Sequence, residues 1–152
     1  MLTHIASTAG EPGTSARSVL SVVSGNDGHG ISCLAARLRV GSVYVGLDAT
    51  GTDAVPNNGS GIRLMSTTAT GCEIGASRSV SSRVGTSSSF GATAVVSGNS
   101  KHGIDSNAPG LRVLSVVVGL GADGMTVRPN GMNGINLAPV GVADLDTTII
   151  GG

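Results

Sequence analysis

Residues 22–64 read VVSGNDGHGISCLAARLRVGSVYVGLDATGTDAVPNNGSGIRL, and residues 95–137 read VVSGNSKHGIDSNAPGLRVLSVVVGLGADGMTVRPNGMNGINL. The two stretches align without a gap at a shift of about 73 residues, and by direct count about 24 of the 43 aligned pairs are identical. The repeat predicts two copies of one unit of roughly 70 residues. We therefore expect a single compact domain over residues 1–152, made of two repeats at approximately 1–74 and 75–152.

A unit of about 70 residues is close to the lower size limit for a stable hydrophobic core. One interpretation of the duplication is that two copies bury a shared core that neither builds alone. The other is that the copies carry two equivalent functional sites related by an approximate two-fold axis. The two interpretations are compatible.

The central strand of each unit is expected at residues 38–47 and 111–120, which are rich in valine. In the second copy Val113 and Val117 would point to one face, and Leu114, Val116 and Val118 to the other. A strand that is apolar on both faces is buried on both sides. We therefore predict an all-β fold with little helix, an internally duplicated β-barrel or β-sandwich, or else a sheet covered by a second subunit.

Shorter elements flank the central strands. Turns rich in Pro, Asn and Gly are expected at 55–59 and 128–131. The one helix candidate, 31–38, has a counterpart that contains Pro109 and Gly110, so we expect a loop or a single turn there. Further short strands are expected at 17–24, 62–66, 74–80, 92–97 and 135–138.

The composition excludes several classes of protein. Nine Lys and Arg balance nine Asp and Glu, which leaves no basic excess for binding nucleic acid. Aromatic residues make up 1% of the chain, so platforms for base stacking are missing. The apolar runs are too short to span a membrane. The first residues lack the basic stretch followed by an apolar stretch that is typical of a signal peptide, so we expect none. We expect no membrane or nucleic-acid partner.

Two histidines, His29 and His102, occupy the same repeat position in the pattern Ser-Gly-Asn-x-x-His-Gly. They are candidates for a polar site together with Asn26 and Asn99. A zinc site needs three or four ligands, and no such set surrounds either histidine, so we predict no metal and no cofactor. The alternative is a turn histidine bonded to the backbone, and a metal on a subunit axis, with His4 taking part, also stays open.

Arg39 and Arg112 are also duplicated, at the start of the central strands, and are candidates for interface pairing. Asp48 or Asp144 are possible partners, and an exposed arginine at a strand end is the alternative. The two cysteines, Cys33 and Cys72, are not duplicated. They are expected to be small buried residues, and the alternative is that they form a single disulfide.

Two fragments match motifs that their context does not support. Residues 119–124 fit GxGxxG, but strand and turn residues follow where a dinucleotide site needs a helix. Residues 27–30 and 85–87 are similar to the histidine and nucleophile segments of subtilisin-type proteases. Both fragments belong to the repeat, so the "base" and the "nucleophile" each occur twice, and a triad also needs an orienting acid and an oxyanion hole. We expect that the chain is not an enzyme.

An uncharged chain rich in small apolar residues tends to bury its surface in an assembly. The segments 111–129 and 138–144, the latter reading APVGVAD, resemble the small phage head-decoration proteins that trimerise on a capsid lattice. The resemblance implies a homotrimer of duplicated units, a pseudo-hexamer, that clamps the capsid or coat protein surface. It also implies a location in the virion. Without that resemblance we expect a cytoplasmic protein.

Three functions therefore stay open. The first is a structural assembly protein that decorates and stabilises a capsid through burial of β-surface. The second is a carbohydrate-binding or adhesin module with two equivalent loop sites. The third is a small hydrolase that uses His29 and His102.

Overall fold

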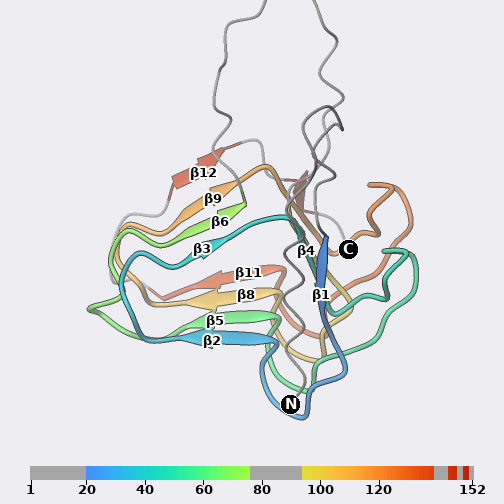
Figure 1. Ribbon diagram of the computed structural model, residues 1–152, viewed down its shortest axis with the longest axis horizontal. Helices are drawn as coiled ribbons and strands as arrows, with labels where there is room; N and C mark the ends of the chain where they lie inside the picture. The colour runs from blue at the N-terminus through green and yellow to red at the C-terminus, as the bar shows by residue number, and fades with distance from the viewer. Residues whose placement is uncertain (1–19, 76–93, 139–143, 147–148, 151–152) are drawn as a thin grey trace, which may run out of the picture.

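The computed structural model describes residues 20–75, 94–138, 144–146 and 149–150. Every regular element within these ranges is a β-strand, which confirms the all-β prediction (Figure 1). The strands form three sheets. Sheet A contains β1 (Ser21–Val23), β4 (Val43–Val45), β7 (Ala94–Val96), β10 (Val116–Val118) and β13 (Ile149–Ile150). Sheet B contains β2 (Ile31–Cys33), β5 (Ile62–Leu64), β8 (Ile104–Ser106) and β11 (Ile135–Leu137). Sheet C contains β3 (Arg39–Val40), β6 (Glu73–Gly75), β9 (Arg112–Leu114) and β12 (Asp144–Asp146).

The chain visits the three sheets in turn, and every pairing between named strands is parallel. Each circuit is called a rung here: β1–β3 is the first, β4–β6 the second, β7–β9 the third and β10–β12 the fourth. The strand β13 returns to sheet A beside β10. This winding is a three-sided parallel β-helix, in which each rung lies on the one before it (Figure 1).

The predicted β-barrel or β-sandwich is not confirmed, because the described strands form three separate sheets that do not close. The predicted central strand at 38–47 is in fact two strands, β3 and β4, which belong to different sheets. Between them Ser42 turns the corner with a φ of 51°, and Ser115 does the same between β9 and β10 with a φ of 54°. A left-handed residue ends a strand, which the valine-rich pattern does not reveal.

Other predicted elements agree with the structure in part. The helix candidate at 31–38 begins with β2 and continues as a loop, as its counterpart predicted. The strands expected near 62–66, 92–97 and 135–138 appear as β5, β7 and β11. The expected strand at 17–24 is described from residue 20 onward, where it forms β1, and the one at 74–80 is described only as far as β6.

A single apolar core runs inside the β-helix through all four rungs. The first and third residues of the strands in sheets A and B point inward, because side chains alternate along a strand. Ile62 and Ile104 are therefore stacked in sheet B, and Val45, Val96 and Val118 in sheet A, all fully buried. The core thus extends across both halves of the sequence. The predicted limits of the domain and of its two repeats stay predictions.

The outer face of sheet A is also apolar, and the chain covers it with its own loops. Tyr44, Val95 and Val117 lie at the middle positions of β4, β7 and β10 and pack with Leu47 and Leu120. These leucines begin the loops 46–57 and 119–130, each of which folds back through an antiparallel bridge. Val117 is consequently 4% exposed within a single chain. The two apolar faces of this strand need no second subunit to cover them.

Candidate functional site

Four asparagines form a stack at the corner between sheets A and B. Asn26 donates from Nδ2 to Oδ1 of Asn57 over 2.7 Å, and Asn57 donates to Oδ1 of Asn99 over 2.8 Å. Asn99 donates to Oδ1 of Asn130 over 3.0 Å. Asn57, Asn99 and Asn130 are buried. The predicted polar residues Asn26 and Asn99 are therefore brought together, with two further asparagines that lie in the predicted turns.

The asparagine stack also donates to backbone carbonyl oxygens at the corner, each of which accepts a backbone N–H of the next rung as well. The Nδ2 atoms of Asn57, Asn99 and Asn130 donate to the carbonyl oxygens of Val23, Val45 and Val96 respectively. The stack therefore joins neighbouring rungs and closes the corner.

The two predicted histidines contact the backbone of the following rung. His29 Nδ1 accepts a hydrogen bond from the backbone N–H of Ser60 at 2.9 Å, and His102 Nδ1 accepts one from Asn133 at 3.3 Å. In a serine-protease triad the Nδ1–H of the histidine is a donor to a carboxylate. Here Nδ1 is an acceptor in both rungs. The similar nucleophile segment, 85–87, lies outside the described residues.

The charge on His29 is opposed by its surroundings. Burial and then the guanidinium of Arg63, whose Nη1 lies 3.1 Å from Nε2, lower the pKa of His29 below its usual value. Lys101 acts in the same direction, and Asp105 acts against it. An arginine has no acceptor atom, so its closeness favours the neutral ring.

A polar column crosses the outer face of sheet B beside His29. The middle residues of the four strands, Ser32, Arg63, Asp105 and Asn136, face one another in register. Arg63 Nε lies 3.8 Å from Asp105 Oδ2, and Asn136 donates to the other carboxylate oxygen over 2.8 Å. This column links the second, third and fourth rungs through side chains.

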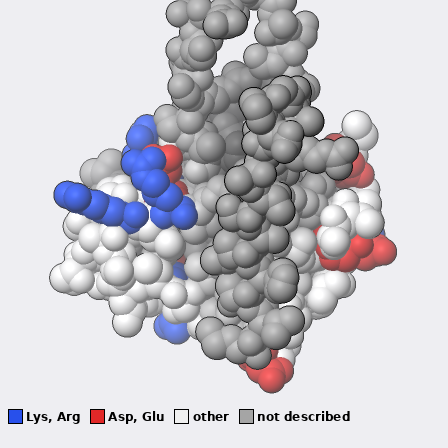
Figure 2. Space-filling view, viewed as in Figure 1, with Lys and Arg blue, Asp and Glu red and all other residues white. Residues whose placement is uncertain are grey.

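Sheet C carries a column of charges that includes both predicted arginines. Arg39 Nη1 lies 3.6 Å from Glu73 Oε1, and Arg112 Nη1 lies 3.4 Å from Glu73 Oε2. Glu73 is buried, whereas the arginines are exposed. The expected partners were Asp48 or Asp144. The observed partner is Glu73, and the register places Asp144 beside Arg112. Figure 2 shows Lys and Arg gathered on this side of the molecule, with an acidic side chain among them.

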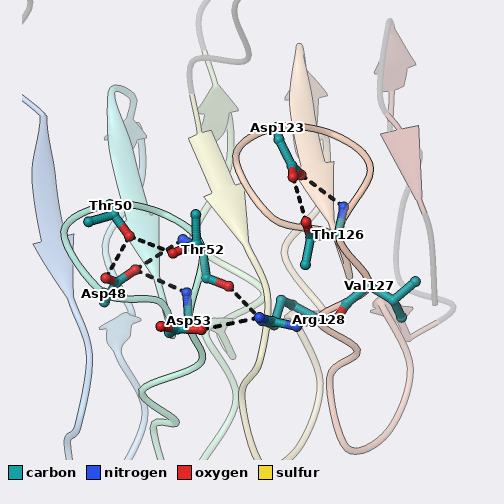
Figure 3. Close-up of polar contacts among 8 residues, drawn as sticks. All are labelled: Asp48, Thr50, Thr52, Asp53, Asp123, Thr126, Val127 and Arg128. Atoms are coloured by element: carbon teal, nitrogen blue, oxygen red, sulfur yellow. Dashed lines mark hydrogen bonds and ion pairs between the residues drawn. The ribbon is translucent and has the colours of Figure 1, made fainter.

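The loops 46–57 and 119–130 contact each other on the outside of sheet A (Figure 3). Arg128 donates from Nε to the carbonyl of Thr52 over 2.6 Å, and its Nη2 lies 3.2 Å from Asp53 Oδ1. The backbone N–H of Ala122 donates to the carbonyl of Gly51. The loops therefore stack like the rungs that they join.

Each loop is held by one aspartate, but the two aspartates are not at equivalent positions. Asp48 accepts hydrogen bonds from Thr50 and from the backbone at 52 and 53, and Asp123 accepts them from Thr126 and from the backbone at 125 and 126. The threonine hydroxyl is the main cause in each case, and it lowers the pKa of each carboxyl to about 2. Asp48 aligns with Gly121 in the repeat, so the loops share a backbone path and differ in their carboxylates.

Cys33 and Cys72 are free cysteines, and Cys72 is buried as expected, whereas Cys33 is partly exposed. Among the described residues, no group of three or more His, Cys, Asp or Glu side chains is placed to hold a metal ion. In the same residues no helix has the length and apolar character needed to cross a membrane.

The sequence did not identify four residues that make these contacts, namely Asn57, Asn130, Arg63 and Glu73. The asparagines carry a signal in the sequence. Asn57 follows Asn26 at a spacing of 31 residues, and Asn130 follows Asn99 at the same spacing. A spacing of 31 residues is the step from the first rung to the second and from the third to the fourth, whereas the step from the second to the third is 42 residues. Arg63 has no such counterpart, because its repeat position holds Asn136, and Glu73 lies outside the aligned segments. The register nevertheless gives Asp144 the place beside Arg112 that corresponds to that of Glu73.

All six predicted site residues thus take part in one kind of contact. Each one bonds to a residue of a neighbouring rung, and the partners are Asn57, Asn130, Ser60, Asn133 and Glu73. Comparisons with models of protein families, with curated proteins and with solved structures find no match. The interpretation of these residues therefore rests on their contacts.

Proposed function

We propose that this chain is a structural assembly protein that stabilises a larger particle as a rigid β-helical rod, most simply as a capsid-decoration protein of a virion. The observation that carries the proposal is that the side chains repeated in both units bond rung to rung. Asn26 and Asn99, His29 and His102, and Arg39 and Arg112 all do so.

Rigidity follows from this use of the polar side chains. The asparagine stack ties one corner through buried hydrogen bonds, and such networks strengthen when every member is satisfied. The charge column on sheet C and the stacked loops on sheet A restrain two other parts of the outside. A β-helix whose rungs are joined at several places around its circumference resists deformation, as a protein that holds other proteins together requires.

The proposal includes the duplication as a structural property. We propose that the halves at 22–64 and 95–137 are two superimposable units of two rungs each, since residues about 73 apart lie two strands apart in the same sheet. The partners are copies of the chain, for which a trimer is the expected number, and a capsid or coat protein surface. The exposed sides of sheets B and C, with their charged columns, are the surfaces offered to that coat.

The test is whether the chain belongs to a particle in the cells or phage that produce it. Material from that source is separated on a density gradient, and the amount of the chain is measured by quantitative mass spectrometry against the major coat subunit. We expect the chain to sediment with large particles in a fixed ratio to that subunit. Purified particles depleted of the chain should lose their contents at a lower temperature than complete ones.

A soluble protein of the same source that is not packaged serves as the control for trapping in the gradient. Recovery of the chain in the same light fractions as this control, with none in the particles, would contradict the proposal.

A further inference from the structure

Identical side chains are buried in the third rung and exposed in the first. Val22 is 42% exposed, whereas its repeat counterpart Val95 is 1% exposed. Ile31 and Leu38 are partly exposed at the first rung, while their counterparts in the third rung, Ile104 and Leu111, are fully buried. The first rung therefore presents, at one end of the β-helix, an apolar layer of the kind that the chain buries elsewhere.

The third rung is buried because it lies on the second. β7 pairs with β4, β8 with β5 and β9 with β6, all in parallel. The fourth rung is the repeat counterpart of the second, and its outer end is partly open. Leu137 in β11 is 40% exposed, whereas its counterpart Leu64 in β5 is fully buried against the third rung.

We propose that the first rung of one chain binds the fourth rung of a second copy, head to tail, and thereby repeats the junction between the second and third rungs. This inference rests on the proposed structural function, names its partner as a second copy of this chain, and replaces the closed trimer expected there by an open arrangement of copies. In sheet B the contact would place β2 of the second copy beside β11, as β8 lies beside β5.

The polar columns continue across this contact without a break in their pattern. At the internal junction Asn57 donates from Nδ2 to Oδ1 of Asn99. At the proposed junction Asn130 would donate in the same way to Asn26 of the second copy. Asn26, at the partly exposed end of the stack in the first rung, would therefore accept a hydrogen bond from Asn130, at the other end of the stack in the fourth rung.

The order of residues along the register of sheet C favours the same contact. Along the register the residues are Arg39, Glu73, Arg112 and Asp144, which alternate in sign from the first rung to the fourth. Arg39 of the second copy would follow Asp144 and extend the alternation. Like charges would meet if two first rungs or two fourth rungs were joined instead, so the column favours a head-to-tail arrangement.

The strand β13 occupies the place that β1 of the second copy would take in sheet A. Ile149 and Ile150 lie beside Val117 and Val118, as Val95 and Val96 lie beside Tyr44 and Val45. The pairing of β13 involves two residues, whereas β7 pairs with β4 through three. Assembly would therefore replace β13 by the longer strand β1 of a second copy. The two strands compete for the same edge of β10.

The experiment measures the mass of the purified full-length chain by size-exclusion chromatography with light scattering over a hundred-fold range of concentration. A head-to-tail contact does not close, so we expect a mass that rises with concentration through successive oligomers. V22K and L137K each place a charge at one end and should give monomers. An equimolar mixture of the two variants keeps one intact pair of ends and should give a dimer that does not grow.

The matched control is M125K, which places the same charge at a residue that is 83% exposed in the loop 119–130. It should assemble as the unchanged chain does. Circular dichroism checks that each variant is folded. The double variant I149G and I150G weakens β13, because glycine disfavours strands, and should assemble at lower concentration than the unchanged chain.

Monomers at every concentration, for both the unchanged chain and the β13 double variant, would overturn the inference. A dimer formed by L137K alone would also overturn it, since that result indicates contact between two first rungs. Either result leaves the proposed function intact if the chain still sediments with particles. Absence from particles together with head-to-tail assembly would contradict that function and not this contact.

Discussion

Asn57 and Asn99 are joined side chain to side chain, Nδ2 to Oδ1 at 2.8 Å, across the junction between the second and third rungs. Both side chains are buried, and each one also donates to a carbonyl of the corner. The bond connects residues 42 positions apart in the chain. It is therefore a contact between the two halves of the molecule and holds them in register.

The first prediction concerns Asn99→Ala. The change removes the buried side-chain hydrogen bonds of Asn99 to Asn57, to Asn130 and to the carbonyl of Val45, and we expect it to lower the free energy of unfolding by about 2–4 kcal/mol. The measurement is urea unfolding followed by circular dichroism. Asn26→Ala is the matched control, because Asn26 lies at the partly exposed end of the stack, and it should cost about 1 kcal/mol. An equal loss in the free energy of unfolding for the two variants would show that Asn99 is not part of a buried hydrogen-bond network.

The second prediction compares two glycines with positive φ. Gly75 has a φ of 87° and Gly110 a φ of 66°. A methyl group at Gly75 would overlap the backbone carbonyl of Leu114 in the next rung, whereas one at Gly110 meets nothing. Gly110→Ala should cost about 1 kcal/mol from backbone strain alone. Gly75→Ala should cost more than about 4 kcal/mol or prevent folding, as measured by thermal unfolding. A small cost at Gly75 would show that β6 and β9 are not in close contact.

The third prediction concerns the aspartates of the two loops. The carboxyl pKa values of about 2 for Asp48 and Asp123 lie below the usual 3.8, so the stability that these groups contribute is present above pH 4 and is lost as the pH falls toward 2. Thr126→Val should raise the pKa of Asp123 toward 3.8 and leave that of Asp48 unchanged. Thr50→Val should do the reverse. Carbon-detected NMR titration measures the pKa of both carboxyl groups. A shift of both pKa values in one variant would contradict the assignment of each lowered pKa to the threonine of its own loop.

The fourth prediction concerns His29, whose pKa is lowered by burial and then by Arg63. A histidine with a pKa below its value in the unfolded chain binds fewer protons when folded, so stability declines as the pH falls below about 6.5. Arg63→Gln should raise the pKa of His29 toward 6.5 and reduce that decline. Arg112→Gln, on sheet C, should change neither. Proton NMR of the imidazole gives the pKa, and an unchanged value in Arg63→Gln would exclude the arginine as a cause.

The all-β class and the positions of several strands could be predicted from the sequence, and the architecture could not. The repeat of about 73 residues spans two rungs, so it hides the period of a single rung. Strands of two or three residues are also too short to show an alternation of polar and apolar side chains. Parallel pairing leaves no local signal, because the partners of Val45 and Ile62 lie tens of residues away.

The apolar run at 113–118 was predicted to be one strand with Val113 and Val117 on one face, but Ser115 divides it into β9 and β10, and Val113 lies in the inner core with Val116 and Val118. Both faces of β10 are buried within one chain, because Leu120 and Ala122 of the chain's own loop help to cover the outer face. The contact partners of the candidate residues could not be predicted from the repeat. Glu73 was missed because it lies outside the aligned segments of the repeat, and Asn57 and Asn130 were missed because segments rich in Pro, Asn and Gly are also ordinary turns.

The spacing between rungs has a consequence for the size of the molecule. Strands in one sheet stand about 4.8 Å apart, so two rungs measure about 10 Å along the axis. Each further copy of the sequence unit would add that same increment and leave the cross-section as it is. Duplication of the unit would therefore lengthen the β-helix in equal steps, and each added unit would continue the existing hydrophobic core.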